Sequence, residues 1–339
     1  MMGKLSFSAI LVVVCMFVFS CKGHRDAKTG SSDSGFLDDS VKHGAVSETG
    51  DYPNAPDPED FYKSPNGLLV MDTLRGRFAD DLAAFNKEVT ASHAKLYVCY
   101  ITAEVGDAIT TCEKTEKPFI AAVCKKDHIN FIDFTNTITK EKGAITFMPI
   151  DGHFNARGAQ IVTNKMATII DTNKNYRSDI TYPPASIPHL LGDEDTSIDR
   201  IVEDKKGLPY KLVTNKQGLR MNGLVEIPKT KQHILLVGDS EIYLAGVDNP
   251  ETITGILQKR YPDKTIINAA RWGYSIDDEL AQWKERTKYT EPDIVILQVS
   301  GVNIPNLYFS QKIKFHRPDT KKHFKPSPLE EKFYNAGFK

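Results

Sequence analysis

The sequence predicts an α/β domain built around a parallel sheet. Five short runs rich in β-branched and aromatic residues have the length and near-continuous apolar character of strands that are buried on both faces. Segments with helical periodicity lie between them, and strands that alternate with helices are typical of layered α/β folds. The five runs span residues 95–101, 129–135, 233–240, 265–270 and 293–300.

Four helices are expected around this sheet. The first covers residues 74–91, where large apolar side chains recur at a spacing of three to four and define one apolar face. Those side chains are Leu74, Phe78, Leu82 and Phe85.

Two of the other three helices carry start signals. Asn249, ahead of Pro250, is a candidate N-cap. Ser275, with Asp278 three positions later, has the pattern of a capping box. The three helices are expected at residues 155–170, 249–261 and 275–287.

Composition limits the classes of function. The chain has 339 residues and a formal net charge of -1 at pH 7. This length is sufficient for one sizeable core or two small ones. The balanced charge gives no reason to expect nucleic acid as a partner.

The N-terminus carries the pattern of an export signal. Lys4 supplies a positive charge, and residues 9–19 form an apolar stretch that is short for a membrane span. The stretch ends in Val-Phe-Ser-Cys, and a small residue directly before Cys21 resembles the bacterial lipobox, in which the cysteine is diacylated. We expect residues 1–20 to be a lipoprotein signal peptide and Cys21 to anchor the protein to a membrane of the bacterial cell envelope, facing the periplasm or the exterior. A plain signal peptide or a weak anchor is the alternative.

A tether and then a folded domain are expected after the signal. Residues 21–60 are rich in Ser, Gly, Asp and Lys and poor in large apolar residues, so they bury too little surface to offset their ordering entropy. The folded domain is expected from residue 61 to residue 339. Within it, Cys99 lies in an apolar run and is expected to be buried. Cys112 and Cys124 flank an expected loop and are candidates for a disulfide, which the sequence alone does not establish.

Residues 171–227 lack a regular pattern and are expected to form a long connection between two halves of the domain. One segment within them has the spacing of an EF-hand calcium loop, but Tyr176 stands at the position of the turn glycine and Tyr182 at that of the bidentate glutamate. We therefore expect a capped, solvated loop, and no metal or other cofactor. The polar residues at that spacing are Asp171, Asn173, Asn175 and Asp179.

Residues suited to acid–base and nucleophilic chemistry occur in both halves. Asp151 and His153 lie two positions apart, just ahead of an expected helix. The sequence Gly238-Asp239-Ser240 closes the third apolar run, and the carboxyl end of a strand is where open α/β sheets place their ligands. Gly238 permits a tight turn there, and Ser240 opens the loop into the next helix.

These residues resemble the sequence blocks of the SGNH/GDSL hydrolase family. Ser240 matches the first block, Gly273 of "NAARWGYS" the second, and Asn303 of "VSGVNI" the third. Asp151 and His153 match the last block. The matches extend over about residues 65 to 305.

The order of the blocks differs from the usual one, in which the serine comes first and the histidine last. An order with Asp-x-His first resembles the SGNH-like domains of the alginate O-acetyltransferase group. The resemblance implies a single, circularly permuted domain, with residues 61–170 as the C-terminal half and residues 228–339 as the N-terminal half. Together the halves supply the five strands of one three-layer α/β/α, flavodoxin-like domain.

The same resemblance implies the order of the strands. The run at 233–240 is expected between those at 265–270 and 293–300. The run at 95–101 is expected beside 293–300, and 129–135 at the edge of the sheet.

The resemblance also implies roles for the five matching residues. Ser240 would be the nucleophile, His153 the base that accepts its proton, and Asp151 the acid that orients the imidazole. The backbone N–H groups of Ser240 and Gly273 and the side-chain amide of Asn303 would form the oxyanion hole.

Two departures from the family pattern accompany these matches. Ile304 follows Asn303 where the family usually has an aspartate, so a polar support is lost. The acid–base pair is Asp-x-His rather than the commoner Asp-x-x-His. Neither departure removes a member of the triad.

Two functions are compatible with these features. The first is an SGNH-type serine esterase or acyltransferase that moves a short acyl group, expected to be acetyl, on an acylated small molecule or a polysaccharide of the cell envelope. The second is a non-catalytic SGNH-like lipoprotein that serves as a binding or scaffold module, which Ile304 and the permuted order motivate.

Overall fold

The computed structural model describes residues 58–102, 110–140, 153–192, 198–203, 209–244 and 246–308. The chain divides into two units, Met1–Gly44 and Ala45–Lys339, and all of the described residues belong to the second. The expected signal peptide, Cys21 and most of the expected tether lie outside the described residues.

The centre of the fold is a five-stranded sheet in the order β2-β1-β7-β5-β6, in which every neighbouring pair is parallel. This order confirms the fold class and the strand neighbours expected from the sequence. The strands are β1 (Lys95–Tyr100), β2 (Asn130–Asp133), β5 (Gln232–Val237), β6 (Lys264–Asn268) and β7 (Ile294–Val299).

The two central strands show why the apolar runs predicted buried strands. All six residues of β5 and of β7 are buried. Successive side chains alternate between the two faces. In β7, Val295 and Leu297 therefore join one hydrophobic core, and Ile294 and Ile296 join the other.

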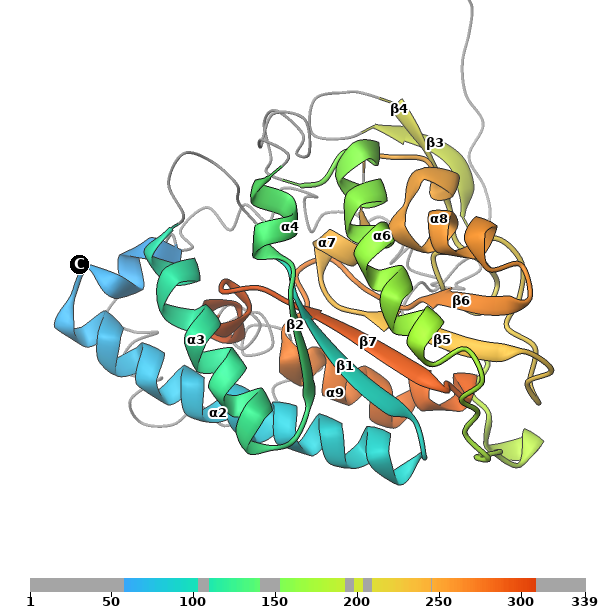
Figure 1. Ribbon diagram of the computed structural model, residues 1–339, viewed down its shortest axis with the longest axis horizontal. Helices are drawn as coiled ribbons and strands as arrows, with labels where there is room; N and C mark the ends of the chain where they lie inside the picture. The colour runs from blue at the N-terminus through green and yellow to red at the C-terminus, as the bar shows by residue number, and fades with distance from the viewer. Residues whose placement is uncertain are drawn as a thin grey trace, which may run out of the picture. The chain divides into compact units, whose positions relative to one another are not determined.

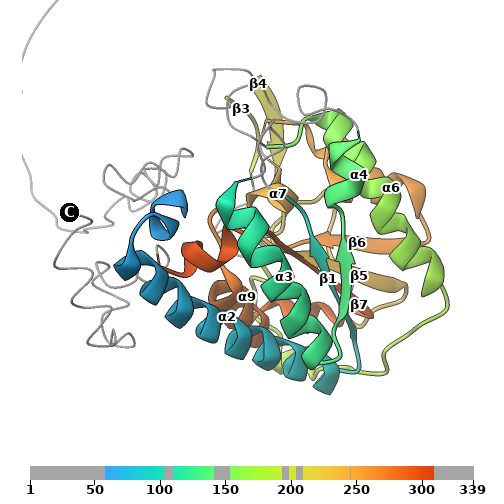
Figure 2. The same cartoon turned by 60° about the vertical axis from the view of Figure 1, so that its left-hand side comes forward.

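Helices cover both faces of the sheet (Figure 1). The first core lies under α2 (Pro65–Ala91), α3 (Thr111–Lys126) and α9 (Ile276–Glu285), and the second under α4 (Thr135–Thr139), α6 (Ala156–Thr172) and α8 (Ile253–Arg260). Figure 2 shows the strands between α2 and α3 on one side and α4 and α6 on the other.

The long helix α2 follows the expected apolar periodicity but begins nine residues earlier. Its N-cap is Ser64, whose side chain accepts a hydrogen bond from the Gly67 N–H at 3.0 Å. All four predicted apolar side chains are buried. Among them, Phe85 meets Trp283 of α9 edge to face, with ring centroids 5.6 Å apart. Pairs of this kind contribute roughly 0.5–1.5 kcal/mol beyond the area that they bury.

The helix α3 was not expected, and its presence changes the interpretation of two cysteines. Cys112 and Cys124 both lie on this helix, where they are buried and free, as is Cys99 on β1. Twelve residues along a helix separate the two by roughly 18 Å. A disulfide requires Cα atoms within about 7 Å, so the suggested pairing is wrong.

The connection between the halves also contains structure that was not expected. Strands β3 (Asp199–Glu203) and β4 (Pro209–Val213) form a separate antiparallel two-stranded sheet. The described residues also form four short 3-10 helices: η1 (Pro58–Tyr62), η2 (Pro184–Ser186), η3 (Asn249–Glu251) and η4 (Thr287–Thr290).

Two of the predicted helix starts differ in outcome. Ser275 is the N-cap of α9, and its backbone N–H donates to Asp278 Oδ2 at 3.2 Å, as the capping-box pattern predicts. Asn249 does not cap α8, because residues 249–251 form η3 first. The N-cap of α8 is Thr252, whose hydroxyl accepts from the Gly255 N–H at 3.0 Å.

The two halves of the sequence share both cores. The first core contains Val98 from one half and Leu297 from the other, and the second contains Met166 and Ile296. The halves therefore do not form separate cores. Among the described residues, no helix is long and apolar enough to span a bilayer.

Candidate active site

The residues predicted to form a site lie at the ends of different strands and come together at one edge of the sheet. Ser240 follows β5, Gly273 lies in the loop after β6, and Asn303 follows β7. Because parallel strands send their carboxyl ends to the same edge, these three loops are neighbours. His153 stands just ahead of α6, whose N-cap is Asn155.

Ser240 and His153 are in contact. The Nε2 atom of His153 lies 2.8 Å from the Oγ atom of Ser240, although the two residues are 87 positions apart in sequence. At this distance the hydroxyl can donate its proton to the imidazole. Asp151, the expected third member, lies outside the described residues.

The turn that presents Ser240 depends on Gly238. Its φ is 148°, a backbone conformation that L-residues rarely adopt. A Cβ atom at this position would lie 2.6 Å from Gln298 Oε1 of β7, so a side chain here would collide with the neighbouring strand. The close approach of Gln298 to this turn also allows a hydrogen bond, because its Oε1 accepts the Asp239 backbone N–H at 3.0 Å.

Ser240 is the first residue of a short helix, α7 (Ser240–Tyr243), and Asp239 is the N-cap. The Oδ1 atom of Asp239 accepts the Glu241 N–H at 2.9 Å. The N–H groups in the first turn of a helix have no partner within that helix. The N–H of Ser240 is therefore suited to donate to a developing oxyanion.

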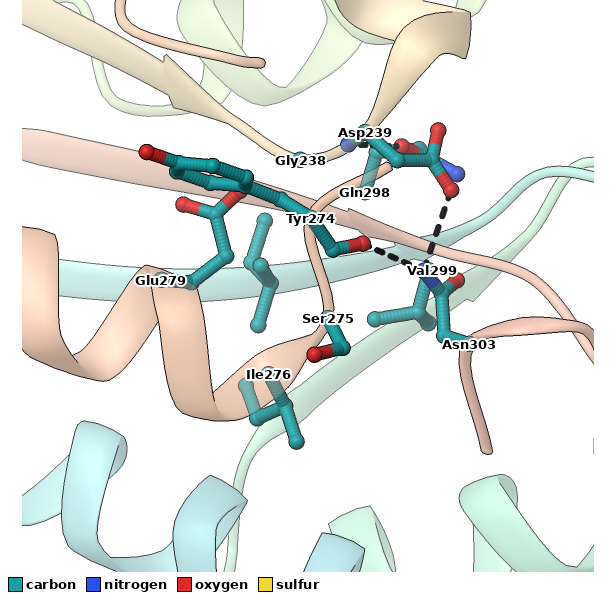
Figure 3. A pocket seen from close by; sticks show the side chains of 10 residues that line it. Gly238, Asp239, Tyr274, Ser275, Ile276, Glu279, Gln298, Val299 and Asn303 are labelled. Atoms are coloured by element: carbon teal, nitrogen blue, oxygen red, sulfur yellow. Dashed lines mark hydrogen bonds between the residues drawn. The ribbon is translucent and has the colours of Figure 1, made fainter. Parts of the chain in front are cut away.

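Asn303 is bound to the residue before the nucleophile (Figure 3). Its Nδ2 atom donates to Asp239 Oδ2 at 3.0 Å and lies 3.5 Å from the carbonyl oxygen of Tyr274. Its Oδ1 atom accepts the N–H and the hydroxyl of Ser300. One N–H of the amide is thus committed to Asp239, and the other has only a long contact. The latter is the N–H that is left for an oxyanion.

Asp239 is buried in the wall of a small cavity that Gln298, Glu279 and Asn303 also line (Figure 3). Burial raises the pKa of the Asp239 carboxyl, while hydrogen bonds from the Glu241 backbone and the Asn303 amide oppose that rise. Through these hydrogen bonds the Asp239 carboxyl joins the turn after β5 to Asn303, which follows β7.

A glycine is favoured at position 273 by its backbone conformation and not by a lack of space for a side chain. Its φ is 68°, in the left-handed region, and a Cβ atom there would meet no atom within 4 Å. The residue is exposed. The backbone of the β6 loop at Gly273 is therefore open to an approaching ligand.

An aromatic side chain packs against the histidine. The ring of Trp272 lies edge to face with that of His153, with centroids 5.0 Å apart, and its centroid is 5.9 Å from that of Tyr243 on α7. Trp272 thus packs against both the imidazole and the ring of Tyr243 on α7. A ring in this place limits the rotation of His153.

Glu113 of α3 holds the segment that carries Asn303 by a hydrogen bond. The Gly301 N–H donates to Glu113 Oε1 at 3.1 Å, and the hydroxyl of Tyr100 donates to the other oxygen of the same carboxylate. Ile304, at the position where the family has an aspartate, is fully buried in the first core. The replacement thus exchanges a polar support for apolar packing.

Several residues of the site were not found from the sequence. Gln298 had one signal, since it is the polar residue inside an otherwise apolar strand. Trp272 stands next to a predicted site residue, but nothing in the sequence pairs it with His153. Arg220 lies in the irregular connection and had no signal.

The segment with EF-hand-like spacing is occupied by protein contacts. Asp171 Oδ1 accepts the Tyr261 hydroxyl at 2.7 Å, Asn173 Oδ1 accepts the Lys95 ammonium at 2.9 Å, and Asp179 pairs with His93. Across the described ranges, no group of three or more metal-ligating side chains has a suitable arrangement.

Comparison with known proteins gives distant structural neighbours. No protein-family model and no curated protein matches the chain. The O-acetyltransferase domain of AlgJ from Pseudomonas putida is similar at a TM-score of 0.45 and 13% identity, covering 78% of this chain and 92% of that one. AlgX from Pseudomonas aeruginosa gives 0.39 and 16%, covering 67% and 61%. PatB1 from Bacillus cereus gives 0.39 and 10%, covering 68% and 90%. At these values, none of the three assigns an activity to this chain.

Proposed function

We propose that this protein is an SGNH-type serine esterase or acyltransferase that moves a short acyl group. The contact of 2.8 Å between His153 Nε2 and Ser240 Oγ is the main support. The motif blocks around Ser240, Gly273 and Asn303, which follow three neighbouring strands, are the second.

The proposed reaction begins with the Ser240 hydroxyl. His153 accepts its proton as the oxygen attacks the carbonyl carbon of an ester, and the C–O π electrons move onto the carbonyl oxygen. Donors at Ser240, Gly273 and Asn303 stabilise the resulting oxyanion. The intermediate collapses, His153 returns the proton to the leaving alcohol, and an acyl-serine remains.

The second half of the reaction uses a different acceptor. Water or an alcohol gives its proton to His153 and attacks the acyl-serine, which releases a carboxylic acid or a new ester and restores Ser240. Asp151 would accept the other imidazole N–H and hold the tautomer in which Nε2 is the base.

The nature of the acyl group and of its carrier forms the finer part of the proposal. Acetyl on a cell-envelope polysaccharide follows from the order of the blocks, which resembles the alginate O-acetyltransferase group, and from the lipobox-like sequence that ends at Cys21. The acceptor is then a sugar hydroxyl in an acyltransferase and water in an esterase.

A non-catalytic scaffold is the second candidate, and one observation favours it. The Asn303 amide donates to Asp239, and Ile304 is part of the core. A protein that keeps the fold while one N–H of the Asn303 amide joins two loops would use this residue for structure and bind a ligand without turnover.

Hydrolysis of p-nitrophenyl acetate tests the choice. We expect Ser240→Ala and His153→Ala each to lower kcat/KM by about 10³-fold or more, and the double variant to lose little more, because the two residues act as a unit. Release of p-nitrophenol is the measurement. Ser186→Ala is the matched control, since the Ser186 hydroxyl donates only to the nearby Pro183 carbonyl, away from the site.

Activity that survives Ser240→Ala would remove the serine mechanism. A wild-type protein with no more activity than Ser240→Ala would favour the scaffold. To test the finer proposal, the acetyl content of the envelope polysaccharide in a deletion strain is compared with the same strain complemented with wild type or with Ser240→Ala.

A further inference from the structure

Arg220 is a buried arginine at the catalytic edge. It lies in the connection between β4 and β5 and is only 2% exposed. A guanidinium stays charged at every pH at which proteins fold, so burial requires that its N–H groups be satisfied. The partners of this guanidinium identify what it does.

Three of its partners are backbone carbonyl oxygens that follow the nucleophile. Nη1 donates to the carbonyls of Tyr243 and of Leu244, the latter at 2.6 Å, and Nη2 donates to that of Val247 at 2.8 Å. The Nε atom donates to Asn249 Oδ1 at 3.2 Å. The guanidinium therefore binds several acceptors at the end of α7 and in the segment that follows it.

The rings of two tyrosines hold the guanidinium in place. Its carbon lies 4.9 Å from the ring centroid of Tyr243 and 5.9 Å from that of Tyr210 on β4. Both tyrosines are buried. Arg220 thus couples the hairpin of the connecting region to the turn that bears Ser240.

Leu244 completes the link to the nucleophile. Its N–H donates to the carbonyl oxygen of Ser240 at 2.7 Å, while its own carbonyl accepts from Arg220. Its φ is 57°, in the left-handed region that a branched side chain enters at a cost. The conformation that closes the turn on Ser240 is thus one that needs external support.

We propose that Arg220 is a positioning residue for Ser240: it holds the C-terminal end of α7 so that the serine hydroxyl stays within reach of His153. This inference rests on the proposed function. The planar guanidinium spreads its five N–H donors over a wider, fixed fork than the compact ammonium of a lysine does, so Arg220→Lys does not reproduce its contacts. A residue of the irregular connection thereby becomes part of the nucleophile turn.

The experiment uses a fluorophosphonate probe, in which the serine oxygen displaces fluoride at phosphorus. The wild-type chain, Arg220→Lys, Arg220→Met and Ser240→Ala are compared for the rate constant of labelling per folded molecule and for kcat and KM on p-nitrophenyl acetate. Arg220→Lys keeps the charge and most of the stem, so it is the variant that folds if Arg220→Met does not.

A matched control lies at the opposite edge of the sheet. Lys229 is also a buried cation with three hydrogen bonds, donating to Ser178 Oγ at 2.6 Å, to the Glu291 carbonyl at 2.9 Å and to Asp293 Oδ1 at 2.7 Å. Lys229→Met should lower stability as Arg220→Met does. It does not touch the nucleophile turn.

We expect Arg220→Lys to lower the labelling rate constant and kcat by about 10- to 100-fold with KM changed by less than about threefold, since displacement of a reacting group by about an ångström has effects of that size. Lys229→Met should label within about twofold of wild type. If the Arg220→Lys variant is labelled at the same rate as the wild-type chain, the inference is overturned and the proposed function is unaffected. Equal losses in Arg220→Lys and Lys229→Met also overturn it. A wild-type chain that is not labelled overturns the proposed function and this inference with it.

Discussion

Asn303 shows how one side chain serves two purposes in the proposed site. Its amide joins the loops after β5 and β7 through Asp239, and its remaining N–H makes only a contact of 3.5 Å with the Tyr274 carbonyl. A weakly held donor can turn to a stronger acceptor at little cost. The negative oxygen of a tetrahedral intermediate is such an acceptor.

Replacement of this side chain should therefore impair catalysis only in part. We expect Asn303→Ala to lower kcat on p-nitrophenyl acetate by about 10²-fold, the typical effect of losing one oxyanion donor, because the backbone donors remain. Steady-state kinetics measure this. Asn306→Ala, three residues further along the same short helical segment, is the control and should stay close to wild type. An Asn303→Ala variant with full activity would remove the amide from the mechanism.

At the scale of single residues, the sequence predicted those that stand in recognisable motifs, such as Ser240 and His153, and missed those that do not. Ser240 and Asn303 are recognisable because a polar residue directly follows an apolar run. Arg220 is not, because its partners are backbone carbonyls that have no sequence signature. Contacts of that kind exist only once the chain is folded.

At the scale of elements, the hydrophobic pattern predicted the five strands of the central sheet but did not predict the helix α3. The side of α3 that faces the protein includes Glu113 and Glu116, and Pro118 lies inside the helix. Glu116 is fully buried because Arg75 and the Tyr62 hydroxyl bind its carboxylate. Because the buried face of α3 is made partly of carboxylates, it has no apolar periodicity. The hydrophobic pattern therefore does not predict this helix.

The packing of α2 against α9 contains a titratable carboxyl. Burial, followed by the nearby charge of Asp277, raises the pKa of Asp81 to about 6 from 3.8. The folded state thus binds the proton more tightly than the unfolded state does. Stability is lost as the pH rises from about 4 through about 6, and the loss is complete above that range.

Asp81→Asn should remove this penalty. We expect the free energy of unfolding at pH 7 to rise by about 1–2 kcal/mol after an allowance for solvent screening, and the gain to disappear below about pH 4. Urea unfolding at the two pH values measures it. Asp80→Asn, at the exposed neighbouring position, is the control and should show a smaller gain, because the Asp80 charge accounts for only part of the Asp81 shift. A gain that is equal at pH 4 and pH 7 would contradict the assignment to ionisation.

At the scale of the whole molecule, the order of the strands was predicted by resemblance and not by pattern. Hydrophobic runs indicate five strands, but they do not say that β7 pairs with β1 across the middle of the sheet. The order of the motif blocks implied that pairing. No motif block lies in the hairpin of β3 and β4, so the resemblance did not predict it. The hydrophobic pattern did not predict it either, because an apolar residue such as Ile201 on β3 is 63% exposed and not part of a buried run.

The proposed attachment of the protein to a membrane depends on Cys21, which lies outside the described residues. If Cys21 is diacylated, cells that express the wild-type chain should incorporate labelled palmitate into it, and the protein should partition into detergent. Cys21→Ala should abolish both. Cys15→Ala, within the apolar stretch before it, is the control and should retain both. A wild-type protein found only in the soluble periplasmic fraction would contradict the anchor.

The parallel pairing of β1 with β7 also has a kinetic consequence. The ladder joins Lys95 to Ile294 and continues to Tyr100 and Val299. Its formation closes a loop of roughly 200 residues, and the length-dependent part of that closure entropy is about 5 kcal/mol. Before β7 has emerged, β1 has only the edge strand β2 as a partner, and a two-stranded piece is not stable alone. Folding must therefore wait for the late strands and proceed slowly, and until then the apolar face of α2 is exposed to chaperones and proteases.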